Sequence, residues 1–96
     1  MIRHIVFFTA KNKTDLPRIR EGLEILGQIE HCAHFEVGTN HHIDKLSEID
    51  VDLVVYAEFA NKAALDAYKA HPLYQKSIAS VRPLRDMRVA ADFTSA

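Results

Sequence analysis

The sequence predicts an α+β fold of the ferredoxin-like type, with the order strand, helix, strand, strand, helix, strand (β-α-β-β-α-β). Three observations lead to this prediction. Four short segments have the apolar content of β-strands, longer segments between them repeat apolar residues at helical spacing, and turn residues or prolines separate them. In this fold a four-stranded antiparallel sheet carries its helices on one face.

The strongest pattern lies in the middle of the chain. Residues 53–59, LVVYAEF, hold two valines and two aromatic residues and are apolar on both faces, which favours a central strand covered on both sides. Asn61 is a candidate helix N-cap, because its side-chain oxygen can accept a free amide proton of the first turn. Residues 62–70 are rich in alanine and predict a helix. Pro72 ends or bends that helix, because proline disfavours helical geometry at His71.

The N-terminal part predicts a strand, a helix and a second strand. Residues 2–9, IRHIVFFT, form the first predicted strand and carry large apolar groups on both faces. Thr14 or Asp15 can cap the following helix, which we expect to end near residues 30–32. Residues 33–39, AHFEVGT, alternate in polarity and predict the second strand.

The remaining segments complete the pattern. Residues 40–50 are polar and predict a long exposed loop. Residues 73–81 predict a further helical piece that Pro83 closes. Residues 84–93 predict the last strand, with Asp92 directed outward or toward a rim.

Helices on one face of a sheet leave the other face uncovered. In this chain that face carries several large apolar side chains, which are Ile5, Phe7, Val54 and Tyr56, or their counterparts on the opposite face if the two faces are reversed. Each such side chain left in water forgoes about 1.5–3 kcal/mol of burial. A patch of several is more than a monomer usually exposes. We therefore expect a homodimer that pairs sheet face to sheet face.

Composition narrows the class of protein. At 96 residues, the chain is expected to form one domain over residues 1–96. Twelve basic and thirteen acidic side chains nearly cancel, so nucleic acid is not an expected partner. The single cysteine, Cys32, cannot form an internal disulfide, which favours a cytoplasmic location. The apolar run from Ile5 to Ala10 is too short for a membrane span, so no membrane partner is expected.

Several of these segments resemble the stress-responsive A/B-barrel (Dabb) family. The resemblance is carried by RHIVFF near the N-terminus, by DLVVYAEFANKAALDAY with the following HP pair, and by RPL before a last strand ending in Asp92 and Phe93. It covers nearly the whole chain. It implies a ferredoxin-like domain that dimerises into an α/β barrel. Function in the family is poorly defined, although some plant members are stress-induced and some are polyketide cyclases.

For those cyclases, the resemblance implies a pocket between the sheet and the helices. His4 and Tyr68 match its histidine on the first strand and its tyrosine on the second helix, and His71 matches the histidine of the HP pair. A further cyclase histidine is replaced here by Tyr74, which titrates near pH 10 and is a poor general base. The predicted ligand-binding residues are His4, Val6, Phe8, Tyr68, His71 and Tyr74.

Two interpretations of these residues stay open. In a catalytic pocket, His4 or His71 would take a proton from a carbon beside a carbonyl, and Tyr68 would hold the developing oxyanion. In a structural role, His4 would be a core histidine bonded to a backbone carbonyl or to Tyr68, and His71 would be a helix C-terminal residue favoured by the helix dipole. The sequence alone favours the structural role.

A second group of metal-ligating residue types lies before, within and after the second predicted strand. Its members are His31, Cys32, His34, His41 and His42. No CxxC or HExxH spacing is present, so we expect surface histidines and no metal site. Haem and flavin have no signature either, and no cofactor is expected. Arg82 and Arg88 are candidates to pair with Asp52, Asp86 or Glu58.

Three functional hypotheses follow. The first is a homodimeric A/B-barrel protein that binds a small apolar or carbonyl-containing molecule in the pocket. The second is a small cofactor-independent enzyme acting on a carbonyl-containing or polyketide-like substrate. The third is an oxygen-using enzyme like the antibiotic-biosynthesis monooxygenases, which share the dimeric barrel architecture and support the hypothesis by fold analogy alone.

Overall fold

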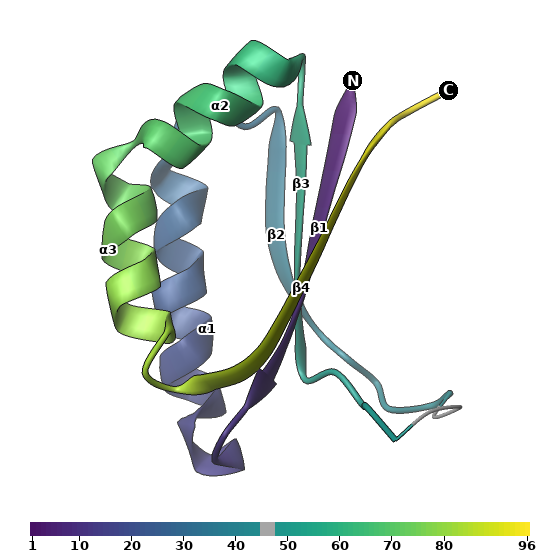
Figure 1. Cartoon of the computed structure of the whole chain (residues 1–96), viewed down its shortest axis with the longest axis vertical. Coiled ribbons are helices and arrows are strands. Elements are labelled where there is room, and N and C mark those ends of the chain that lie inside the picture. The colour runs from purple at the N-terminus through teal and green to yellow at the C-terminus, as the bar shows by residue number, and fades with distance from the viewer. Residues whose placement is uncertain (45–47) are drawn as a thin grey trace.

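Across residues 1–44 and 48–96, which are the residues described, the computed structural model contains four strands, three α-helices and two 3₁₀ turns. The strands are β1 (Ile2–Ala10), β2 (His34–Thr39), β3 (Leu53–Phe59) and β4 (Arg85–Thr94). The helices are α1 (Leu16–Glu24), α2 (Lys62–Ala70) and α3 (Pro72–Val81), and the 3₁₀ turns are η1 (Lys13–Asp15) and η2 (Ile25–Gln28). The strands pair in the order β2-β3-β1-β4, all antiparallel, and the helices lie on one face of the sheet (Figure 1). The predicted ferredoxin-like fold is confirmed.

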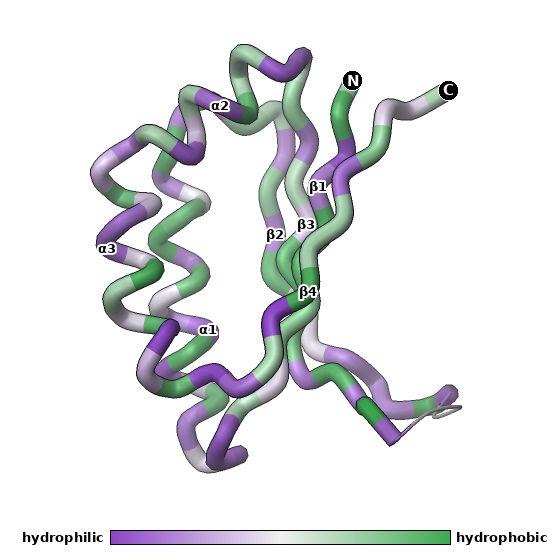
Figure 2. The backbone as a smooth tube through the Cα atoms, viewed as in Figure 1, coloured by the Kyte–Doolittle hydropathy of each residue, from purple (hydrophilic) through white to green (hydrophobic). Residues whose placement is uncertain are grey.

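Strict alternation along the two central strands separates the two faces of the sheet. In β3 every second residue, from Leu53 to Phe59, is buried beneath the helices, and in β1 the same holds from His4 to Ala10. The residues between them are only partly buried, because no helix covers their face. Figure 2 shows that apolar segments run through the strands as well as along the helices. The predicted division of faces is therefore correct.

The ends of the helices follow local capping chemistry. Asn61 is the N-cap of α2, as predicted, and its Oδ1 accepts a hydrogen bond from the amide of Ala64 at 2.9 Å. Of the two predicted caps, Asp15 holds the N-cap position of α1, although its side chain makes no capping bond, and Thr14 does not cap it. The preceding 3₁₀ turn η1 is capped by Asn12, which accepts from the Thr14 amide at 3.0 Å.

The first helix is shorter than predicted. The α-helix continues as the 3₁₀ turn η2, which ends at Gln28. The helical path stops there because Ile29 adopts an extended backbone and carries the chain toward β2. Gly27 favours this early end, since glycine has low helix propensity. It also allows close packing, because a Cβ at this position would lie 3.0 Å from the ring of Phe35.

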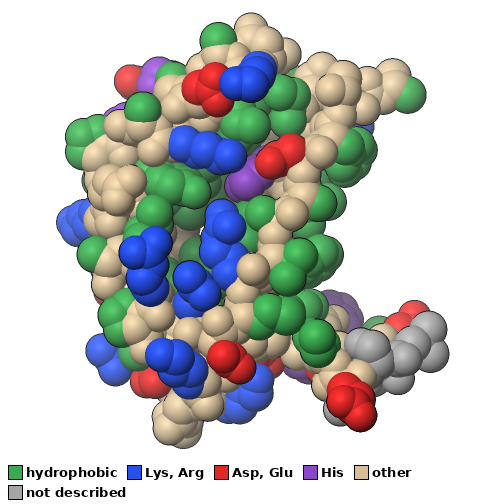
Figure 3. Space-filling model, in the orientation of Figure 1, with side chains coloured by type: hydrophobic (Ala, Val, Ile, Leu, Met, Phe, Trp, Pro, Cys, Tyr) green, Lys and Arg blue, Asp and Glu red, His purple; other side chains and the backbone are tan. Residues whose placement is uncertain are grey.

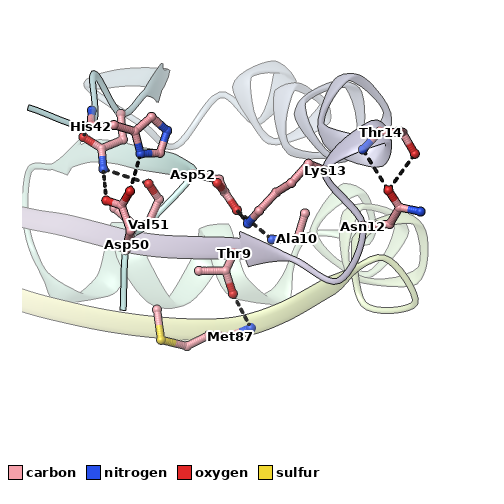
Figure 4. A network of polar contacts seen from close by, with 11 residues as sticks. Thr9, Ala10, Asn12, Lys13, Thr14, His42, Asp50, Val51, Asp52 and Met87 are labelled. Carbon is pink, nitrogen blue, oxygen red and sulfur yellow. Dashed lines mark hydrogen bonds and ion pairs between the residues drawn. The ribbon is translucent and has the colours of Figure 1, made fainter. Parts of the chain in front are cut away.

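The described residues between β2 and β3, 40–44 and 48–52, project beyond the sheet on the side away from the helices (Figure 1). The base of this segment is fixed to β1 by Asp52, which is 4% exposed and accepts hydrogen bonds from the Ala10 amide at 2.9 Å and from Lys13 Nζ at 2.5 Å (Figure 4). A second link joins His42 Nδ1 to Asp50 Oδ2 at 2.6 Å. One carboxylate oxygen of the buried Asp52, Oδ2, thus accepts both hydrogen bonds. None of the helices in the described residues is long and apolar enough to cross a membrane.

The contact between α1 and α3 depends on Gly22. A Cβ built at Gly22 would lie 2.7 Å from Val81 Cγ2 and 3.2 Å from Ser80 Cβ, so the two helices approach closely at this point. Ser77 Oγ also donates a hydrogen bond to the Gly22 carbonyl at 2.8 Å. Glycine is unfavourable inside a helix by about 1 kcal/mol, and close packing offsets this cost.

We predict that Gly22→Ala lowers the free energy of unfolding by about 1–3 kcal/mol, because overpacking outweighs the gain in helix propensity. Urea unfolding measures this change. The exposed neighbour Glu21 provides the control, since Glu21→Ala should alter stability by less than about 0.5 kcal/mol. A Gly22→Ala protein more stable than the parent would contradict the close helix contact.

Candidate functional site

A cavity of about 240 Å³ opens between the sheet and the helix layer. Sheet residues form its floor, aliphatic residues of the helices form its walls, and polar aromatic groups and arginines complete it. The lining residues are His4, Val6, Phe8, Leu23, Leu26, Val55, Tyr68, Tyr74, Ser77, Ile78, Val81, Arg82, Arg85 and Arg88. Figure 3 shows the hollow between the helices and β4, with basic side chains gathered around it and a histidine near one end.

The cavity exists because β4 contributes little bulk to the helix-facing side of the sheet. In the β1–β4 register, Ala90 lies opposite Val6, and Arg88 lies opposite Phe8. A methyl group at Ala90 leaves space beside the apolar side chains of β1. Almost the whole of β4 is correspondingly exposed. The helices therefore close over β1 and β3 and leave an opening at the β4 side.

His4 sits at the inner surface of this cavity and is only 2% exposed. Its Nδ1 pairs with Asp92 Oδ1, because the register of β1 and β4 places the two residues directly opposite each other. A carboxylate at Nδ1 accepts the ring N–H, which leaves the lone pair on Nε2 and makes Nε2 the proton acceptor of the ring. The expected partners of His4, a backbone carbonyl or Tyr68, are replaced by Asp92.

Tyr68 is the largest fully buried side chain of the described residues, with 1% exposure. Its ring contacts those of His4, Phe59 and Tyr74, with centroid distances of 6.1, 4.9 and 5.3 Å. Burial raises the pKa of Tyr68 well above its ordinary value, with smaller contributions from Cys32 and Tyr74, and Arg88 opposes the shift. Tyr68 is therefore a neutral O–H donor at physiological pH. In the described part of the chain, its hydroxyl has no hydrogen-bond partner.

The structure brings together most of the predicted ligand-binding residues. His4, Val6, Phe8, Tyr68 and Tyr74 all line the cavity. His71 does not line it.

The position of His71 follows from Pro72, which starts the new helix α3. His71 Nδ1 accepts a hydrogen bond from the Leu73 amide at 3.1 Å and caps this helix. The His71 ring lies edge-on to His31, with a centroid distance of 6.3 Å.

Two of the other histidines contact carboxylates. His34 Nε2 contacts Glu36 Oε2 at 2.7 Å, and His42 is held by Asp50. Cys32 is half-buried, and burial raises the pKa of its thiol. Within residues 1–44 and 48–96, no three of the His, Cys, Asp and Glu side chains are grouped in a way that could hold a metal ion.

Sequence reasoning missed the grouping of Arg82, Arg85 and Arg88, which come from the end of α3 and the start of β4 and line the cavity together. The predicted ion pairs of Arg82 and Arg88 with Asp52 or Glu58 are wrong. Asp52 forms its ion pair with Lys13 instead, and Glu58 Oε2 accepts a hydrogen bond from the Tyr56 hydroxyl at 2.5 Å. The sequence carried one signal of this grouping. The three arginines are spaced three residues apart on both sides of Pro83, which closes the helix and precedes β4, the edge strand next to β1.

The fold and the cavity define a class of small α+β proteins in which a one-sided helix layer and a sheet enclose a ligand-sized space. The sequence model of the stress-responsive A/B-barrel domain matches residues 2–95, and the chain belongs to this family. No curated protein matches the chain by sequence.

Solved structures agree with this assignment. A Dabb family protein with a ferredoxin-like fold from Mesorhizobium loti is 27% identical, with a TM-score of 0.78 and coverage of 99% of this chain and 96% of that one. A dimeric ferredoxin-like protein of unknown function from Jannaschia is also 27% identical, with a TM-score of 0.79 and 98% of both chains covered. An antibiotic biosynthesis monooxygenase shares the fold at 17% identity, with a TM-score of 0.74 and coverage of 100% and 99%.

Burial of Tyr68 predicts an effect on stability at alkaline pH. The folded state holds the phenol proton more tightly than the unfolded state, so stability falls as pH rises above about 10, the ordinary tyrosine value. Tyr68→Phe should remove this part of the loss. Thermal unfolding at pH 8 and pH 11 tests it, and an equal loss in both proteins would show that Tyr68 ionises as easily folded as unfolded.

Proposed function

We propose that this protein is a homodimer in which each chain binds a small apolar or carbonyl-containing molecule in the cavity between sheet and helices. The observation that carries the proposal is the cavity itself, which has an apolar floor and a few convergent polar groups. Its volume of about 240 Å³ lies just below the range of about 300–1,000 Å³ that is usual for sites of drug-sized ligands, so it suits a smaller molecule. A natural sequence that filled its core for stability alone would not leave this space.

The dimer part of the proposal is supported by the helix-free face of the sheet. Val89 and Phe93 are each 49% exposed there. They lie across from Phe7 and Arg3 in the β1–β4 register, so they extend the apolar surface of Ile5 and Phe7. Exposure of this group of apolar side chains to solvent is unfavourable for a monomer. Relatives with the same fold are described as dimeric, including the one from Jannaschia.

Two further features suit a sheet-to-sheet interface. The projecting segment carries Ile43, which is 79% exposed, and it extends on the helix-free side, where a partner chain would lie (Figure 1). Three polar side chains of this face are hydrogen-bonded to one another within one chain. Arg3 Nη1 donates to the Tyr56 hydroxyl at 3.2 Å, and this hydroxyl donates to Glu58. Burying such hydrogen-bonded groups costs less than burying free ones.

A second candidate function is that of a cofactor-independent enzyme. The pairing of His4 with Asp92 favours it, since a carboxylate-oriented imidazole can take a proton through Nε2, and the neutral Tyr68 can donate to an enolate oxygen. The monooxygenase hypothesis rests on fold similarity alone. The test of proton transfer is exchange of the α-protons of small ketones into deuterated water, which His4→Gln should abolish.

Charge on the helix-free face should break the dimer. We expect Val89→Asp to shift the protein from twice the chain mass to the chain mass in light scattering at micromolar concentration, because two carboxylates would be buried without partners. Gln75→Asp, on the exposed side of α3, is the control and should stay dimeric. A parent protein that is monomeric under these conditions would rule out the dimer.

Filling the cavity should block binding. The neutral fluorescent probe N-phenyl-1-naphthylamine should bind the parent protein saturably at one molecule per chain. Ile78→Trp places an indole in the cavity wall and should abolish this binding, whereas Gln75→Trp on the same helix, outside the cavity, should not. Equal binding by all three proteins would mean that the probe binds elsewhere.

A further inference from the structure

We infer that the cavity selects a small organic acid, with the carboxylate at the arginine mouth and the apolar body inside. The arginine mouth is the set of Arg82, Arg85 and Arg88. This inference rests on the proposed binding function and adds the chemical class of the ligand.

The strand register places the arginine mouth on the cavity side. Arg88 lies opposite Phe8 and Arg85 lies opposite Ala10, and both partners in β1 are buried beneath the helices. A register shift between Phe8 and Ala10 brings the two arginines, three residues apart, to the same side of β4. Arg82 follows α3 directly, and its amide still donates to the Ile78 carbonyl at 2.9 Å. Basic side chains gather at this hollow in Figure 3.

The arginine mouth lacks counter-charges. Within residues 1–44 and 48–96, no acidic residue lines the cavity, and the nearby carboxylate of Asp92 is engaged by His4. Among the described residues, no acidic side chain lies within ion-pair distance of any of these three guanidinium groups. The Arg85 guanidinium instead donates a hydrogen bond from Nη1 to the Asp86 backbone carbonyl at 3.1 Å.

Several of the other basic residues of the described chain are paired with acids. Arg18 pairs with Asp15 and Arg20 with Glu24 on α1, and Lys62 pairs with Asp66 on α2. The formal net charge is −1, so the arginine mouth is a local concentration of positive charge on a protein with no basic excess. Three like charges at one opening repel one another, and an anion between them would relieve this repulsion.

The interior decides what kind of anion fits. Val6, Phe8 and Leu26 line the space behind the arginines, and apolar surfaces of this kind do not hold a bare inorganic ion. A guanidinium group binds a carboxylate through two parallel hydrogen bonds, which favours this head group. A volume of about 240 Å³ accommodates a short chain or a small aromatic ring system and excludes a long-chain lipid.

Calorimetric titration with octanoate and with 1-octanol tests the inference, because the two probes share a chain length and differ in charge. We expect octanoate to bind the parent protein at least tenfold more tightly than octanol. The double variant Arg82→Gln/Arg88→Gln should lose most of this preference, about tenfold for each charged hydrogen bond removed, and should bind octanol as before. Retained octanol binding shows that the cavity of the variant is intact.

Lys76→Gln is the matched control, since it removes one positive charge from the exposed side of α3 and should leave both affinities unchanged. Equal affinity for the two probes, or an octanoate preference that survives in the double variant, would overturn the inference and leave the proposed binding function standing. If neither octanoate, octanol nor the neutral fluorescent probe binds, both proposals fail. Octanoate binding that persists in Ile78→Trp would place the acid outside the cavity and also contradict the inference.

Discussion

All three α-helices in the described part of the chain pack on one face of the sheet, and both surfaces of functional interest follow from this one-sided packing. On the covered face, alternate residues of β1 and β3 form the core with α1, α2 and α3. Because β4 offers only small or charged side chains to the helices, the cover stays open at that edge and the cavity remains. On the uncovered face, apolar residues such as Val54 and Val89 lack an intramolecular partner, and this deficit is the physical basis of the proposed dimer.

The cavity combines groups whose burial is costly unless each is satisfied. His4 lies in an apolar core and is compensated by Asp92 across the sheet, and Tyr68 remains neutral because its pKa is raised by the same burial. The arginine mouth lies at the solvent-exposed end of the cavity, where its charges stay partly hydrated. The proposed ligand would thus meet cations at the entrance and an acceptor or donor farther inside. This arrangement suits an acid with a second polar group, and it is compatible with both binding and proton transfer.

The sequence predicted the strands and their faces well, because two-residue alternation in β1 and β3 is a local property. It also predicted that His4, Val6, Phe8, Tyr68 and Tyr74 share a pocket, through resemblance to known relatives. It could not assign Asp92 to His4, since that contact joins residues 88 positions apart and depends on the register of the first and last strands. The arginine mouth was missed for the same reason. His71 was grouped with the pocket because it matches the histidine of the HP pair in the resemblance, whereas in this chain it caps α3 and does not line the cavity.

The most direct test of one-sided packing is the relaxation of methyl NMR signals by a soluble gadolinium chelate, measured on the native protein. If the helix-free face is enclosed by a second copy, the methyl groups of Val54 and Val89 should be as protected from the chelate as those of Val6 and Val55 in the core. Strong relaxation of Val54 and Val89 at concentrations where the core valines are protected would show that this face is in water, and it would contradict the account.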